Sequence, residues 1–152
     1  AYFGLLSAGH GSLGYVKGLG KMAEYNMDQT PFANPRAPEF APFVADFKRR
    51  FGKDPDIVPA GVNYSAGLLL AHAIERAGSA DPGAIRDALA KSSFKDHLLC
   101  GDPISFDEVG QNKNVVAPII QVFQGEQYVV WPKRFAQKEP VFPMPSWDEI
   151  LK

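Results

Sequence analysis

The sequence comprises 152 residues, of which 45% are hydrophobic and 22% are charged, and its formal net charge is −1. A chain of this size can build one globular domain, and its balanced charge argues against nucleic-acid binding, which usually needs basic residues gathered on one face. No uninterrupted apolar run approaches the ~20 residues of a membrane-spanning helix, which predicts a soluble chain.

The first part of the chain is predicted to form a strand, a helix and a second strand. Residues 2–6 read as a short buried strand, and Ser12 is a candidate cap for a helix that reaches about Glu24. An extended run at 25–29 precedes a loop at 30–38 that contains three prolines. The apolar face of the helix contains Tyr15, Leu19 and Met22, and two glycines, Gly18 and Gly20, weaken it.

The middle of the chain is predicted to be helical. One helix begins between Pro38 and Pro42 and ends at Gly52. The next, at 64–77, is apolar at nearly every position, which indicates a helix covered on most sides. The Asp-Pro pair at 81–82 caps and begins a third helix. The apolar stripe of the first helix consists of Phe40, Phe43, Val44, Phe47 and Phe51.

The last part of the chain changes to strand-like patterns. Runs rich in β-branched and aromatic residues occupy 104–107, 115–123 and 127–131, and the last two are predicted to pair as a hairpin. The proline-rich tail at 132–147 is predicted to be an extended strap pinned by Phe142 and Trp147.

The segment Gly9-x-Gly11-x-x-Gly14 matches the spacing of a dinucleotide-binding fingerprint. Asp28 follows near the end of the next extended run, where such a fold places an acidic residue. The fold would then need further strand–helix units, and the sequence continues instead with a proline loop, helices and a hairpin. A glycine-rich turn without a nucleotide is therefore the favoured interpretation, and an NAD-dependent oxidoreductase fragment is the alternative.

Few residues indicate chemistry. The histidines have no metal-ligand spacing, so no metal site, cofactor or catalytic residue is predicted. His10 lies in the glycine-rich turn and is a candidate ligand contact, whereas His72 reads as a core or boundary residue. The single cysteine, Cys100, excludes an intrachain disulfide and reads as a small buried side chain.

Four segments in order resemble the C-terminal part of periplasmic binding proteins of the branched-chain amino acid type, which are receptors of ABC importers. An aromatic stripe ending in Phe-Gly, a Tyr-led apolar helix, an Asp-Pro-capped helix and a Gly-x-(Ile/Val)-x-Phe-Asp motif share the order of that family. The segments are FVADFKRRFGKDP, NYSAGLLLAHAIERAGSADPGAIRDAL, CGDPISFDEVGQNKN and IIQVFQGEQYVVWP.

This resemblance implies an α/β fold, the type I periplasmic binding fold, in which two α/β lobes are joined by a hinge. Residues 1–37 would contribute a strand, a helix, a strand and the proline loop to the second lobe, and 38–100 helices to the first lobe. Residues 101–131 would contribute the hinge crossing and hairpin, and 132–152 the tail. The resemblance covers only the last part of such a receptor, so the missing N-terminal part, a companion chain or a domain-swapped copy is expected to cover the apolar helix.

The resemblance also implies a role without catalysis: capture of a small solute by hinge closure and delivery to a membrane permease from the periplasm. The predicted ligand contacts are Ser7, Ala8, Gly9, His10 and Ala60. None of them carries the carboxylate found in leucine-binding members, so amino acids, amides, ureas and aromatic acids all remain candidates. The small residues at 59–61 would leave room for a bulky ligand. A cytosolic amide- or amino-acid-sensing regulator of the same fold is the second alternative.

Overall fold

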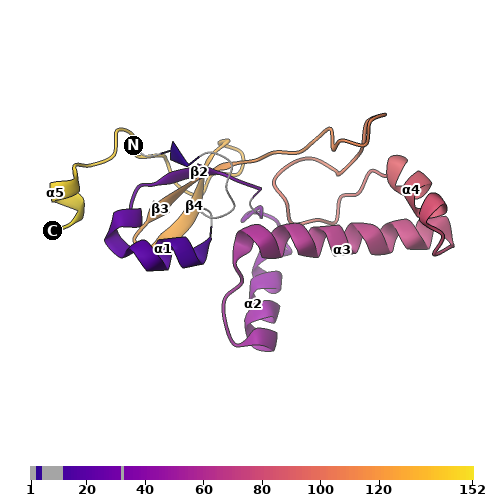
Figure 1. The fold of residues 1–152 in the computed structure, drawn as a ribbon, viewed down its shortest axis with the longest axis horizontal. Helices are drawn as coiled ribbons and strands as arrows, with labels where there is room; N and C mark the ends of the chain where they lie inside the picture. The colour runs from indigo at the N-terminus through magenta and orange to yellow at the C-terminus, as the bar shows by residue number, and fades with distance from the viewer. Residues whose placement is uncertain (1–2, 5–11, 32) are drawn as a thin grey trace.

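The structure is a computed structural model that describes residues 3–4, 12–31 and 33–152. Its elements fall into two groups in space (Figure 1). The four strands, α1 and α5 form one group, here called the sheet half, and α2, α3 and α4 form the helical half. In chain order the elements are β1 (Phe3–Gly4), α1 (Leu13–Leu19), the 3₁₀ turn η1 (Gly20–Ala23), β2 (Met27–Gln29), α2 (Phe40–Phe51), α3 (Ile57–Ala77), α4 (Pro82–Ala90), β3 (Ile119–Phe123), β4 (Glu126–Trp131) and α5 (Trp147–Ile150).

Two described stretches connect the halves. The chain enters the helical half through residues 30–31 and 33–39 and returns to the sheet half through residues 115–118. α3 begins beside the sheet half and extends away from it, with α4 at its far end (Figure 1). The structure is thus a mixed α/β arrangement, in agreement with the predicted fold class.

The sheet has the strand order β1-β2-β3-β4, with β1 parallel to β2 and the other pairs antiparallel. The predicted β3–β4 hairpin is confirmed. Gln124 and Gly125 form its turn with φ of 55° and 75°, as a type I′ turn requires. The Glu24 carboxylate accepts their backbone N–H groups at 2.7 and 2.6 Å. The run at 104–107 is not a strand, because it finds only isolated bridges and no continuous partner.

α1 is shorter than the sequence predicts. Ser12 caps it as expected, since its hydroxyl accepts the N–H of Tyr15 at 3.1 Å. The helix ends at Gly20, whose φ of 53° is readily adopted only by glycine, and η1 follows. Because the 3₁₀ turn changes the helical period, Met22 leaves the apolar face where it was predicted and is 50% exposed.

The aromatic stripe of α2 forms as predicted but is not covered by the described chain. Ring centroids lie 6.1 Å apart for Phe43 and Phe47 and 4.6 Å apart for Phe47 and Phe51. The helix ends at Gly52 in the left-handed conformation, with φ of 69°. No residue of α2 is buried, and Phe51 is 62% exposed.

α3 begins at Ile57, well before the predicted start at Tyr64. Pro59 lies in its first turn, where the missing N–H would have no helical partner, so this proline does not delay the helix. With 21 residues and a mean hydropathy of 1.4, α3 has the length and composition of a membrane-spanning helix, contrary to the prediction. A core helix meets the same criterion, but the described chain does not cover α3 on most sides as predicted, since Tyr64 is 44% and Leu70 48% exposed. Its buried residues are Val58, Gly61, Ser65 and Ala73.

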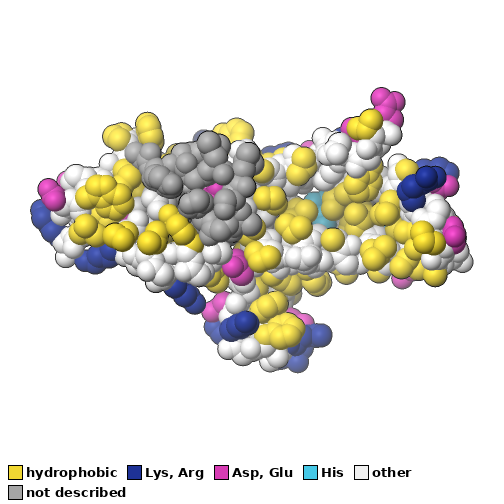
Figure 2. Space-filling view, viewed as in Figure 1, with side chains coloured by type: hydrophobic (Ala, Val, Ile, Leu, Met, Phe, Trp, Pro, Cys, Tyr) yellow, Lys and Arg dark blue, Asp and Glu magenta, His cyan; other side chains and the backbone are white. Residues whose placement is uncertain are grey.

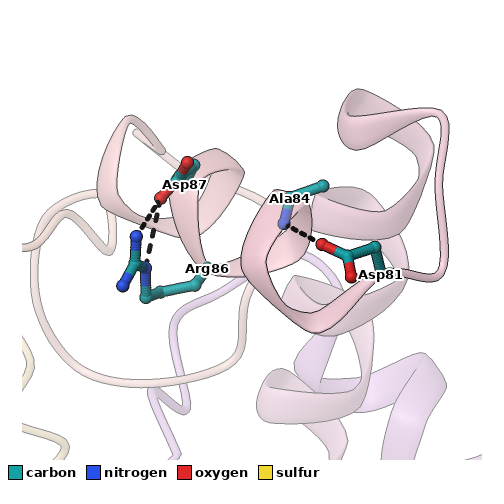
Figure 3. Close-up of polar contacts among 4 residues, drawn as sticks. All are labelled: Asp81, Ala84, Arg86 and Asp87. Carbon is teal, nitrogen blue, oxygen red and sulfur yellow. Dashed lines mark hydrogen bonds and ion pairs between the residues drawn. The ribbon is translucent and has the colours of Figure 1, made fainter.

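The third predicted helix, α4, is confirmed. The Asp81 carboxylate accepts the N–H of Ala84 at 2.9 Å, and Pro82 is the first helical residue (Figure 3). The Arg86 guanidinium donates to the neighbouring Asp87 carboxylate at 2.7 and 3.1 Å (Figure 3). This ion pair is exposed, so the cap rather than the pair accounts for where the helix begins.

A hydrophobic cluster joins the two halves. Val58 at the start of α3 packs with Ile120 and Val129 of the sheet. Cys100 belongs to the same cluster and is 2% exposed, as its apolar surroundings predicted. Phe135 of the tail completes it and is 8% exposed. A second cluster, of Val16, Ala23 and Val122, holds α1 and η1 against the sheet.

The tail is extended as predicted, but different residues hold it in place. Phe142 is 74% exposed and Trp147 is 48% exposed, so neither anchors it. The anchors are Phe135, in the cluster above, and the buried side chain of Gln121, which hydrogen-bonds the backbone of Val141 in both directions at 2.9 and 3.0 Å. The error follows from reading aromatic side chains alone as anchors, because a buried amide can bind an extended backbone as firmly.

Candidate ligand-binding site

Four of the five predicted ligand contacts, Ser7, Ala8, Gly9 and His10, lie outside the described residues. The fifth, Ala60, is half-buried near the N-terminal end of α3. The described elements that flank the predicted site are therefore α1, which follows residues 7–10 in the chain, and the start of α3.

Asp56 lies where the N-terminal ends of α1 and α3 meet. It is half-buried and immediately precedes α3, and the backbone N–H groups of Leu13 and Val58 face its carboxylate. Burial raises the pKa of the Asp56 carboxyl, and attraction to these two N–H groups opposes the rise. Burial is the larger effect, so the charged carboxylate is disfavoured on balance, although N–H groups at helix N-termini attract anions. Asp56 is thus the described acidic residue that lies near the start of both helices.

The sequence analysis did not single out Asp56. An aspartate directly before an apolar helical run is a recognisable helix-start signal. Placing the helix start at Tyr64 hid that signal, because Asp56 then read as part of the preceding loop. The proximity of Leu13 could not be read from the sequence, since it depends on how the two halves pack.

The geometry does not favour the dinucleotide interpretation. Gly9 and Gly11 lie outside the described residues, and Gly14 lies inside α1. Asp28 occupies a central strand and is 3% exposed, so its carboxylate is not presented to a ribose. The strand after β2 in the sheet is antiparallel to it, whereas the dinucleotide fold continues with parallel strands.

A small cavity lies between α1 and the sheet. Tyr15, Asn26 and Asp28 line its polar side, and the Asn26 amide donates to the Tyr15 hydroxyl at 2.9 Å. Its volume of about 10 Å³ has room for a water molecule and not for an amino acid. Within the described chain, this cavity is therefore part of the packing between α1 and the sheet and is not a binding site for an amino acid.

The largest hollow described lies on the helical half, between α2 and α3, and is here called the aromatic groove. Its volume is about 710 Å³, and the rings of Phe43 and Tyr64 approach to 4.8 Å within it. Hydrophobic side chains also gather along the helical half in Figure 2. The groove is lined by Pro38, Glu39, Pro42, Phe43, Asp46, Phe47, Arg50, Phe51 and Tyr64.

The titratable groups in residues 12–31 and 33–152 give no sign of metal or nucleophilic chemistry. No cluster of three or more His, Cys, Asp or Glu side chains suited to a metal occurs in the part of the chain that the structure describes. His72 is half-buried with its ring 5.2 Å from that of Phe94, as expected of a boundary residue. Burial raises the pKa of the Cys100 thiol to about 12, although the nearby charge of Arg134 lowers it somewhat. Such a thiol is a poor nucleophile at neutral pH.

Comparison with known proteins identifies relatives. The family model described as periplasmic binding protein matches residues 4–126. Among solved structures, the leucine binding protein LivK from Thermotoga maritima superposes with a TM-score of 0.65 and 25% identity, over 84% of this chain and 36% of that one.

Two further structures share the fold. An ABC transporter substrate-binding protein from Desulfitobacterium hafniense, in complex with Leu, has a TM-score of 0.59 and 22% identity, over 77% of this chain and 38% of that one. A branched-chain amino acid ABC transporter protein from Thermus thermophilus with bound valine has a TM-score of 0.56 and 18% identity, over 84% and 37%. The chain therefore spans between 36% and 38% of the length of these three structures.

Proposed function

The chain belongs to the periplasmic binding protein family, and from this premise we propose that it forms part of the solute-binding component of an ABC importer. Its ligand would be an amino acid or a related amide or aromatic acid, held between two lobes that close about a hinge. Closure on a ligand is a population shift between open and closed forms and requires no chemistry on the solute.

The observation that carries this proposal is the family match over residues 4–126 together with the shared fold of solute receptors. The structures with bound leucine and valine favour an amino acid as the first ligand to test. Substrate-binding proteins of ABC transporters are not enzymes, and in this chain the high pKa of Cys100 makes its thiol a poor nucleophile at neutral pH.

We propose that residues 7–10 and Ala60 contact the ligand from opposite lobes. Ala60 lies near the start of α3, and Asp56, which precedes that helix, lies near the backbone N–H of Leu13 at the start of α1. Pro59 and Ala60 are small, which leaves space for a ligand side chain larger than that of valine, whereas Ala33 fills the space beside Gly61. None of the residues at 7–10 is acidic, so the ligand's amino group, if it has one, would need another partner.

The two halves correspond, in this proposal, to parts of two lobes. Residues 1–37 would belong to the second lobe, 38–100 to the first, 101–131 to the hinge crossing and the hairpin, and 132–152 to the tail. The aromatic groove would then be covered by polypeptide that completes the first lobe: the missing N-terminal part, a companion chain or a domain-swapped copy. Its area of exposed aromatic side chains supports this assignment, because such patches mark contact surfaces.

The proposed location and the proposed membrane partner rest on membership in the family. The receptor would work in the periplasm, and its closed form would dock on a membrane permease. A signal sequence in the upstream gene would support this location, whereas its absence would favour the cytosolic amide-sensing regulator.

Ligand binding is tested by calorimetric titration of the full-length protein with L-leucine, L-valine, L-phenylalanine, acetamide, urea and benzoate. The proposal expects saturable one-to-one binding of at least one of these, with no binding of NAD. Ala60→Trp should then reduce affinity at least tenfold, while Ala90→Trp, at the exposed end of α4, should not. Saturable binding of NAD with no solute bound would overturn the proposal.

Cover of the aromatic groove is tested by a matched pair of substitutions in the full-length protein. Phe51 and Val109 are 62% and 76% exposed in this structure. If other polypeptide covers the groove, Phe51→Ser lowers the free energy of unfolding by about 2 kcal/mol or more, because the ring loses its buried area. Val109→Ser, in a turn, should be nearly neutral. Equal, small effects of both substitutions would show that the groove is open to water.

A further inference from the structure

The tail crosses the junction between the two halves. Residues 132–142, here called the strap, run from the cis Trp131–Pro132 bond to the cis Phe142–Pro143 bond. The family match ends at residue 126, so it assigns no role to the strap.

The strap is firmly bound to the sheet half. The N–H of Gln137 donates to the Val129 carbonyl at 2.8 Å, and the Gln137 side chain accepts the Val129 N–H at 3.0 Å. The Lys138 ammonium lies 3.7 Å from the ring centre of Tyr128. Gln121, 0% exposed, holds Val141 by the two hydrogen bonds described above. These contacts fix the strap to β3 and β4.

The same strap also contacts α3 and the segments that lead into and out of the helical half. The Arg134 guanidinium lies 3.5 Å from the Asp102 carboxylate. Phe135 packs in the cluster that contains Val58 of α3. The carbonyl of Ala136 accepts two N–H groups of Arg36, one at 3.2 Å. Three consecutive strap residues therefore contact parts of the chain outside the sheet half.

These contacts differ in kind from the covalent connections at residues 30–39 and 115–118. They can be lost without breaking the chain, and they are all formed in the arrangement seen here. If the halves move apart, either the Arg134–Asp102 pair separates, or the strap moves with the helical half and its hydrogen bonds to the sheet break. The contacts therefore stabilise this arrangement relative to a more open one.

We propose that residues 134–136 of the strap brace the junction between the two halves non-covalently and bias the halves toward the arrangement seen here. This rests on the proposed function in one respect, namely that the halves are lobes that move. The Arg134–Asp102 pair is the adjustable contact, because both side chains are exposed and their removal leaves the core intact. An exposed pair of this kind shifts an equilibrium by about two- to fivefold.

The test is made without ligand, on the full-length protein. Cys100 is replaced by alanine, and spin labels are attached to cysteines introduced at Lys17 of α1 and Lys91 at the end of α4, which are both exposed. Double electron–electron resonance then reports the distance between the halves. Arg134→Asp should shift about two- to fivefold more of the population to longer distances, because it places two carboxylates together.

Two variants make the result specific. The double variant Arg134→Asp with Asp102→Arg restores the pair in reverse and should return the distances to those of the parent protein. Lys133→Asp makes the same change of charge one residue away and should leave them unchanged, since no contact of Lys133 with the helical half is described. Unchanged distances in Arg134→Asp, no rescue in the double variant, or an equal shift in Lys133→Asp would each overturn the brace. Because no solute is present, failure of the brace is distinguishable from failure of the protein to bind a solute.

Discussion

Gly61 of α3 lies directly against Ala33. Ala33 belongs to the segment between β2 and α2, and this segment crosses α3 at Gly61. A Cβ added to Gly61 would lie 2.9 Å from the Cβ of Ala33, which is itself fully buried. Real Cβ atoms do not approach so closely, so this contact requires glycine on the helix. The start of α3 and the crossing segment are thus packed backbone to backbone.

Gly61→Ala should therefore destabilise the protein although alanine is the better helix former. Overpacking a tight contact costs typically about 1–3 kcal/mol, which exceeds the gain in helix propensity of about 1 kcal/mol. The measurement is the free energy of unfolding in urea for the full-length protein.

Gly67→Ala is the control, because Gly67 lies in the same helix with nothing within 4 Å of an added Cβ. It should stabilise the protein by up to about 1 kcal/mol. A gain in stability in both variants would mean that the contact with Ala33 is looser than described.

Ser65 ties the loop that returns along α3 to the helix. Its hydroxyl donates to the Gly61 carbonyl at 2.8 Å and accepts the Leu98 N–H at 3.0 Å, and Ser65 is 0% exposed. Ser65→Ala should cost about 1–3 kcal/mol, because it leaves the buried Leu98 N–H without a partner. Ser93→Ala, at an exposed position in the loop after α4, is the control and should change the unfolding free energy by less than about 0.5 kcal/mol.

The sequence predicted the elements that depend on local signals, and it misplaced those that depend on contacts between distant residues. α4 and the β3–β4 hairpin are set by local signals, the Asp81–Pro82 cap and the turn at Gln124–Gly125, and both are confirmed. The start of α3 was misplaced because the helix was predicted from the apolar run that begins at Tyr64, and residues 59–61 were interpreted as a segment next to the ligand. Gly61 is required by Ala33, which is distant in the sequence, and no local pattern reveals such a contact.

The candidate site was less predictable than the fold. The resemblance supplied residues 7–10 and Ala60, and the structure describes only Ala60 among them. Asp56 emerged only when the starts of α1 and α3 were seen together. The anchors of the tail were missed for a similar reason, since the polar side chain of Gln121 becomes an anchor only once the sheet buries it.

The Cys100 thiol should resist alkylation in the native protein. With a pKa of about 12, very little thiolate exists at pH 8, and the side chain is 2% exposed. Iodoacetamide should modify it more than about 100-fold more slowly than a free cysteine, whose pKa is about 8.5. In 6 M guanidinium chloride the rate should become that of free cysteine. Mass spectrometry follows the modification, and rapid native labelling would contradict the buried position.

The raised pKa of Asp56 predicts a pH dependence of stability. Because the pKa is higher in the folded than in the unfolded chain, the contribution of the carboxyl to stability is fully present below its unfolded pKa. This contribution is lost as the pH rises through the folded pKa. Asp56→Asn removes the ionisation and keeps a side chain of nearly the same size and shape, of a type equally favoured before a helix.

The variant should therefore gain stability relative to the parent as the pH rises from about 3 to 7, with little difference at the acidic end. Melting temperatures of the full-length protein across this range measure the gain. Asp96→Asn, at an exposed aspartate, is the control and should show no comparable trend. If Asp56→Asn instead loses stability as the pH rises, attraction of the carboxylate to the N–H groups of Leu13 and Val58 outweighs its burial. Asp56 would then act as an ionised link between the halves.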